Sequence, residues 1–226
     1  MHPLDGAYER VNGAREHLDT LKPLIRDFSQ EVSKGVTLNY KMGVSIVRGQ
    51  KRRVPIGNAK MTQGATPPRI SRLIGEVVQN LRTALDYLVY ELARFDAKTI
   101  VENTQFVIVD SEKDFQKNLW HLRGLTGEHI AAFKRLQPFD GCQWTKRIAD
   151  LSNPDKHRHL TIVKSPVIVA IDPRITQAIL AGEHVNVNDY ATISITFSDG
   201  LPAIENLEQL VLRVGQTLDN FKPEFK

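Results

Sequence analysis

The stretch from residue 69 to residue 94 constrains the fold more than any other part of this chain. Its apolar residues recur at intervals of three and four, which places their side chains on one stripe of an α-helix. They are Ile70, Leu73, Ile74, Val77, Val78, Leu81, Ala84, Leu85, Leu88, Val89 and Leu92. The stripe is wide enough to be packed by more than one partner, and Thr66-Pro67-Pro68 supplies an N-cap with proline in the first turn. We therefore predict a central helix here.

A first helix is predicted from about residue 5 to residue 33, where apolar residues follow the same helical spacing. Pro23 interrupts it, and because proline removes one backbone hydrogen bond and clashes with the preceding turn, we expect a kink or two abutting helices. A last helix is predicted from near Pro202, with one apolar face that ends at Phe221.

Between the first two helices the period changes to two. Apolar residues alternate with polar ones from Val36 to Ile46, as in a half-buried β-strand. Residues 48–51 are typical of a turn, and 53–56 could return as a short strand that Pro55 confines to an edge. The sequence therefore predicts a β-hairpin inserted after the first helix.

After the central helix, Thr104 to Val109 predicts a short extended piece, and 126–136 and 143–152 each suit a short helix. Asn153-Pro154 should end the second of these, because the residue before proline disfavours helical angles. Short strands are then expected at 160–163, 167–171, 184–187 and 190–197, with Asn188-Asp189 as a hairpin turn.

The order of these elements predicts an α+β fold, and it lacks the regular βαβ alternation of a doubly wound sheet. We expect a helical bundle with an inserted basic β-hairpin, and a C-terminal antiparallel β section closed by a helix. The chain of 226 residues is predicted to form a single domain, with a sub-boundary near residue 165. That boundary separates a helical part (1–165) from the β section and last helix (166–226).

Composition excludes several classes of protein. With 41% apolar and 25% charged residues the chain resembles ordinary globular proteins. The one cysteine, Cys142, cannot form an internal disulfide, and the first residues lack the apolar core of a signal peptide, so we expect a cytoplasmic protein. The longest apolar run, Val167 to Ile171, is far below the ~20 residues that cross a bilayer. No membrane partner is expected.

The positive charge is concentrated in the predicted hairpin. The formal net charge is only +4, yet residues 34–60 hold seven cations and no acidic residue. They are Lys34, Lys41, Arg48, Lys51, Arg52, Arg53 and Lys60. A basic ribbon tip can contact RNA or DNA, and Arg48, Lys51, Arg52 and Arg53 would make these contacts. Alternatively, the cations keep an exposed edge strand from pairing with another chain.

Two further clusters could carry chemistry. Asp155-Lys156-His157-Arg158-His159 combines imidazoles, a carboxylate and two cations, which suits acid-base catalysis, with Lys156 and Arg158 binding phosphate. A structural turn and a metal site are the alternatives there. On the central helix, Arg82 and Asp86 lie one turn apart, and Asn80 borders the apolar stripe. They could be an ordinary surface ion pair, or a buried pair that holds the 155–159 segment.

These motifs together resemble a known family. Asn80-Leu-Arg82-Thr-Ala-Leu-Asp86-Tyr87-Leu88, Thr104-Gln-Phe106-Val-Ile108, Leu136-Gln137-Pro-Phe139 and Asn153-Pro-Asp155-Lys-His157-Arg158 are similar to motifs of a widespread family of uncharacterised bacterial proteins. The resemblance covers roughly residues 5 to 165 and brings no established activity with it.

A more distant resemblance is to HEPN-type helical bundles, many of which are ribonucleases that need no metal. Their motif is an arginine followed a few residues later by histidine, where this chain has Tyr87. Our hypothesis on this resemblance is that Arg82 stabilises phosphate charge and His157 supplies the missing imidazole as general base or acid, with Asp86 and Asn80 orienting them. Neither cofactor nor metal is expected.

Besides a small-molecule or metal site around His157 and His159, two functions remain open. One is a HEPN-like ribonuclease, or a catalytically degenerate relative that still acts on RNA. The other is a non-catalytic module that binds nucleic acid or protein through the basic hairpin, and it could form a homodimer through its broad apolar helices.

Overall fold

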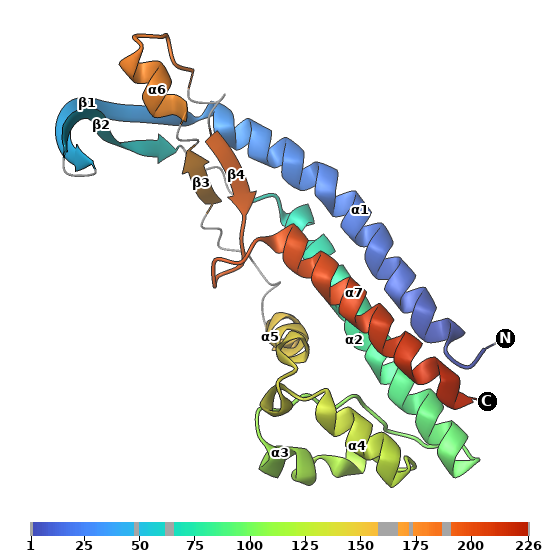
Figure 1. The fold of residues 1–226 in the computed structure, drawn as a ribbon. Helices are drawn as coiled ribbons and strands as arrows, with labels where there is room; N and C mark the ends of the chain where they lie inside the picture. The colour runs from blue at the N-terminus through green and yellow to red at the C-terminus, as the bar shows by residue number, and fades with distance from the viewer. Residues whose placement is uncertain are drawn as a thin grey trace. The chain divides into compact units, whose positions relative to one another are not determined.

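The computed structural model describes residues 2–47, 50–61, 66–157, 167–171, 174–186 and 191–225. Within these residues the fold is α+β, with long helices and two small antiparallel sheets (Figure 1). The predicted fold class is therefore confirmed. In the described part of the chain, no helix is both long and apolar enough to cross a membrane.

The chain divides into two compact units, each assembled from separate segments. The first contains Met1–Leu21, Pro68–Ile162 and Ile204–Lys226, and the second contains Lys22–Pro67 and Val163–Ala203. The single domain with a sub-boundary near residue 165 stays a prediction.

Three long helices contribute to the first unit: α1 (Asp5–Lys34), α2 (Pro68–Ala97) and α7 (Ala203–Phe221). Every residue of the predicted apolar stripe on α2 is buried, which confirms that prediction. α1 is one continuous helix that includes Pro23, so the alternative of two abutting helices is wrong. Tyr8 of α1 donates a hydrogen bond from its hydroxyl to Asp219 of α7, at 2.7 Å.

Shorter elements complete the first unit. They are α3 (Glu112–Lys117), η1 (Leu119–Leu122), α4 (Gly127–Arg135), η2 (Pro138–Asp140), α5 (Gln143–His157) and η4 (Lys222–Phe225). The Thr126 hydroxyl caps α4 by accepting a hydrogen bond from the backbone N–H of His129.

The predicted end of α5 is wrong. The helix continues through Asn153 and Pro154 to His157, so residues 153–157 are helical rather than a loop. Proline disfavours helical angles at the preceding residue but does not forbid them, so the local signal was too weak to end the helix.

In the second unit, β1 (Val36–Val47) and β2 (Gln50–Met61) form the predicted antiparallel hairpin. β2 is longer than the predicted return strand and contains Pro55 opposite Met42. Proline is compatible with this position because each strand of a two-stranded ribbon has one edge that pairs with nothing in the sheet. The predicted turn includes residues 48–49, which lie outside the described residues.

The second sheet pairs β3 (Val167–Ile171) with β4 (Ala191–Ile195) in antiparallel fashion, as the predicted β section requires. A short helix that the sequence did not predict, α6 (Arg174–Leu180), follows β3 and contacts β2 of the hairpin. Residues 184–186 are not extended as a strand, contrary to prediction. The expected strand at 160–163 and the turn at 188–189 lie outside the described residues.

Candidate functional sites

The hairpin brings cations and exposed apolar side chains together on one face. Its register pairs Val44 with Arg53 and Ile46 with Lys51, and directly opposed residues of an antiparallel pair point to the same side. Val44 is 63% exposed and Ile46 is 71% exposed, and Lys51 and Arg53 are exposed as well. Two large apolar side chains and two cations therefore share one solvent-facing patch, which we call the ribbon patch.

Two other cations predicted at the hairpin tip are less fully defined. Arg48 lies outside the described residues. The backbone of Arg52 is in register with Ser45.

On α2, Arg82 and Asp86 hold the backbone of one residue between them. Arg82 donates from Nη2 to the Phe106 carbonyl oxygen at 2.5 Å, and the Phe106 N–H donates to Asp86 Oδ1 at 2.9 Å. Arg82 Nε lies 3.9 Å from Asp86 Oδ1. Both Arg82 and Phe106 are buried, and burial lowers the pKa of the guanidinium while the Asp86 charge opposes that shift.

Gln137 holds the next residues of the same segment. Its Oε1 accepts from the Val109 N–H at 3.1 Å, and its Nε2 donates to the carbonyl oxygens of Val107 and Phe133 at 2.8 and 3.0 Å. The predicted extended piece from residue 104 to 109 forms no strand. Side chains of α2 and Gln137 satisfy backbone groups that a neighbouring strand would otherwise pair.

Three of the motifs that carry the family resemblance therefore meet in space. The Arg82–Asp86 pair, the segment around Phe106 and the segment around Gln137 form one hydrogen-bonded cluster. Its contacts are those of a structural support for a segment without a β partner. The same residue types at these spacings thus have a structural use in this chain.

A histidine that the sequence did not assign to this cluster lies beside it. Burial, the largest effect, lowers the pKa of His121, and the charges of Arg123 and Arg82 add to this. A hydrogen bond with the Asn103 backbone and the charge of Asp86 act in the opposite direction. The ring lies against that of Trp120, which is 53% exposed, with 3.5 Å between the centroids and 30° between the ring planes.

Asn80, another predicted catalytic residue, forms its hydrogen bond elsewhere on α2. Asn80 donates from Nδ2 to the Glu76 carbonyl oxygen and lies against Gly13 of α1. Tyr87 accepts a hydrogen bond from Arg10 of α1 at 3.3 Å. His157 is the last residue of α5, and Lys156 precedes it in the same helix. The side chains of both residues lie outside the described part of the structure. Arg158 lies outside the described residues.

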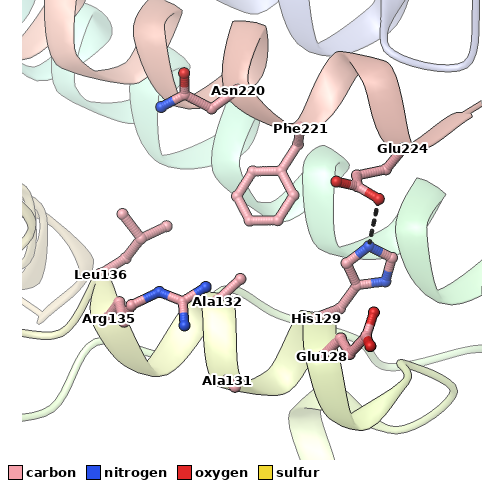
Figure 2. A pocket seen from close by; sticks show the side chains of 9 residues that line it. All are labelled: Glu128, His129, Ala131, Ala132, Arg135, Leu136, Asn220, Phe221 and Glu224. Atoms are coloured by element: carbon pink, nitrogen blue, oxygen red, sulfur yellow. Dashed lines mark ion pairs between the residues drawn. The ribbon is translucent and has the colours of Figure 1, made fainter.

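A separate hollow of about 570 Å³ lies between α4 and the end of α7 (Figure 2). Its lining residues are Glu128, His129, Ala131, Ala132, Arg135, Leu136, Asn220, Phe221 and Glu224. Sequence reasoning did not find this site, because its residues come from segments far apart in the chain. The only local signal is that His129 follows the Thr126 N-cap.

His129 is held in place by a carboxylate beneath the hollow. Its Nδ1 lies 2.6 Å from Asp96 Oδ2, and both side chains are about nine-tenths buried. Asp96 also accepts from the Thr126 N–H at 2.8 Å. When Nδ1–H donates to Asp96, Nε2 presents a lone pair toward Glu224, 3.7 Å away. An imidazole that a carboxylate orients in this way has the arrangement of a general base.

Among the residues that the structure describes, no group of three or more histidine, cysteine or acidic side chains could hold a metal ion. Fold and sites define the chain as an α+β helical protein with a basic β-ribbon, a hydrogen-bonded cluster on α2 and a histidine-lined hollow. Compared with models of protein families, curated proteins and solved structures, the chain has no match in any of the three.

Proposed function

We propose that this protein binds nucleic acid through the ribbon patch of its β-hairpin. The observation that supports this most is the strand register, which sets Lys51 and Arg53 directly across from the exposed Ile46 and Val44. Among described residues, no salt bridge or hydrogen bond joins either cation to a carboxylate, so both charges are available to an anion.

The mixed character of the patch suits a nucleic acid better than a simple anion. Lysine and arginine neutralise backbone phosphates, while apolar side chains contact sugars, thymine methyl groups or base faces. A two-stranded ribbon also fits the major groove of B-DNA, which is about 12 Å wide. Single-stranded RNA offers phosphates and unstacked bases to the same patch.

Protection of the ribbon edges is the alternative use of these cations. Charged side chains on edge strands discourage pairing with another chain. That use needs charge but gives no reason for Val44 and Ile46 to be exposed beside the cations. We therefore favour nucleic-acid binding over edge protection. The two functions predict different results when the cations are replaced by neutral residues.

The test measures binding of a fluorescent duplex DNA and of a single-stranded RNA by anisotropy across a salt series. The double variant Lys51→Gln/Arg53→Gln should weaken binding and lower the logarithmic salt slope by about 1.8 on duplex DNA and about 1.4 on single-stranded RNA, because each phosphate contact contributes roughly 0.9 on B-DNA and 0.7 on a single strand. Val44→Ser/Ile46→Ser should weaken binding with little change in slope. Comparison of the affinities for duplex DNA and for single-stranded RNA shows which nucleic acid the protein prefers.

The matched control is Arg69→Gln/Lys113→Gln, which removes the same charge from two exposed side chains outside the hairpin. If that variant lowers affinity and slope as much as the hairpin variant, the patch is not the site. Absence of binding by the unaltered protein at low salt would also end the proposal. Aggregation of the hairpin variant without any loss of binding would instead support edge protection.

Ribonuclease activity stays a prediction. Arg82 and Asp86 are engaged with Phe106, which gives both groups a structural use, so we place binding ahead of cleavage. Incubation with mixed RNA, with and without a chelator, tests the prediction. Chelator-resistant cleavage that His157→Ala removes would support it, and no cleavage under either condition would exclude it.

A further inference from the structure

We propose that the hollow between α4 and α7 binds a small zwitterion, with its ammonium group beside His129 and its anionic group beside Arg135. This site is independent of the nucleic-acid proposal, since none of its lining residues belongs to the hairpin. Figure 2 shows His129 and Glu224 near one end and Arg135 with Leu136 toward the other.

The histidine end offers acceptors for an ammonium group. In the tautomer that donates Nδ1–H to Asp96, Nε2 of His129 is an acceptor 3.7 Å from Glu224 Oε2. Carboxylates of Glu224 and Glu128 line the same end. An ammonium group has three N–H donors, which one imidazole nitrogen and two carboxylates can accept together.

The opposite end offers donors for an anion. Arg135 and Asn220 both line the hollow, and neither has a hydrogen bond or ion pair to another described residue. A guanidinium presents parallel N–H groups that match a carboxylate or phosphate, and the amide of asparagine adds further donors.

Between the two charged ends, the hollow is lined by apolar side chains, two of which are small. Glu128 and Arg135 lie seven residues apart on one face of α4, which is about 10 Å along the helix axis. Ala131 and Ala132 separate them, and their small side chains leave room above the helix, opposite Phe221 of α7. The hollow of about 570 Å³ has the size of ordinary small-molecule sites. The arrangement fits a molecule with charged ends and an aliphatic middle.

The test compares three probes by calorimetry and NMR titration of the full chain: ε-aminocaproate, caproate and hexylamine. Because only ε-aminocaproate satisfies both ends, it should bind at least about tenfold more tightly than either single-ended probe. Arg135→Met should bring its affinity down to that of hexylamine, and Glu224→Gln should bring it toward that of caproate. Ala132→Leu should weaken all three by filling the hollow.

Arg135 and Glu224 are exposed, so these substitutions leave the core intact, and circular dichroism verifies this. Arg69→Met and Glu9→Gln are the matched controls, since both change exposed charges away from the hollow. The proposal is overturned if the three probes bind equally, if ε-aminocaproate shows no binding at millimolar concentration, or if the control variants weaken it as much as Arg135→Met.

Discussion

Replacement of Arg82 by methionine should destabilise the fold strongly, because this side chain holds a buried backbone group. Arg82→Met keeps a long apolar stem but removes the donor that bonds the Phe106 carbonyl oxygen. A hydrogen bond to a charged group contributes about 1.5–3 kcal/mol net. Arg82 is only 7% exposed and Phe106 is fully buried, so water cannot readily replace the lost donor.

The loss of the neighbouring charge adds to this cost. Asp86 lies 3.9 Å from Arg82 Nε and would keep its bond to the Phe106 N–H without the cation beside it. Its side chain is 31% exposed, so solvent still stabilises part of the carboxylate charge. We expect a total loss of about 2–3 kcal/mol in the free energy of unfolding.

The assay is urea unfolding followed by circular dichroism. The free energies of unfolding of the variant and of the unaltered protein are compared on the condition that both have the same m-value, the slope of free energy against urea concentration. Arg94→Met is the matched control on the same helix, since Arg94 is exposed and pairs with Glu91 at 3.3 Å. It should lose less than about 1 kcal/mol, as exposed pairs do. Asp86→Asn and the double variant complete a cycle that isolates the coupling of Arg82 with Asp86.

A loss below about 0.5 kcal/mol for Arg82→Met would refute the structural use of this residue, since such values are typical of surface substitutions. The outcome also bears on the ribonuclease prediction. If Arg82→Met or Arg82→Ala unfolds the protein, loss of any cleavage in that variant says nothing about catalysis.

Three further predictions concern other polar side chains. Gln137→Leu should cost about 2–4 kcal/mol in urea unfolding, because a fully buried amide loses three hydrogen bonds; a cost below about 1 kcal/mol would contradict its role. Because burial lowers the pKa of His121, the unfolded state binds more protons, so stability should rise with pH and level off above about 6.5; His121→Gln should flatten this profile. Tyr8→Phe should cost about 0.5–1.5 kcal/mol at neutral pH. Since burial and the bond to Asp219 raise the pKa of Tyr8, that difference should shrink only as the pH rises above about 10, and an earlier decline would argue against it.

Much of the fold follows from local patterns. The stripe on α2 and the apolar face of α7 are visible within single segments, because each helix buries one face. The alternation in β1 correctly predicts a strand, but the expected burial of its apolar face is wrong at Val44 and Ile46, which are exposed. The concentration of cations in the hairpin is also a property of one short segment. The proposal that Lys51 and Arg53 contact nucleic acid therefore begins from the sequence alone.

The secondary structure differs from the prediction where the local sequence signals are weak. α5 continues through Pro154, and α6, which buries Ile175 and Ala178, forms where no helix was predicted. The segment around Phe106 lacks a strand partner and relies on side chains 20 to 30 residues away in sequence.

The candidate sites also combine features that the sequence predicts with features that only the tertiary structure shows. The spacing of Arg82 and Asp86 predicted a pair, but only the tertiary structure directed both groups to Phe106. The pairing of His129 with Asp96, 33 residues earlier, leaves no periodic trace in the sequence. Periodicity reports which face of an element is buried, whereas the partner of a buried polar group depends on which distant segments the packed helices bring together.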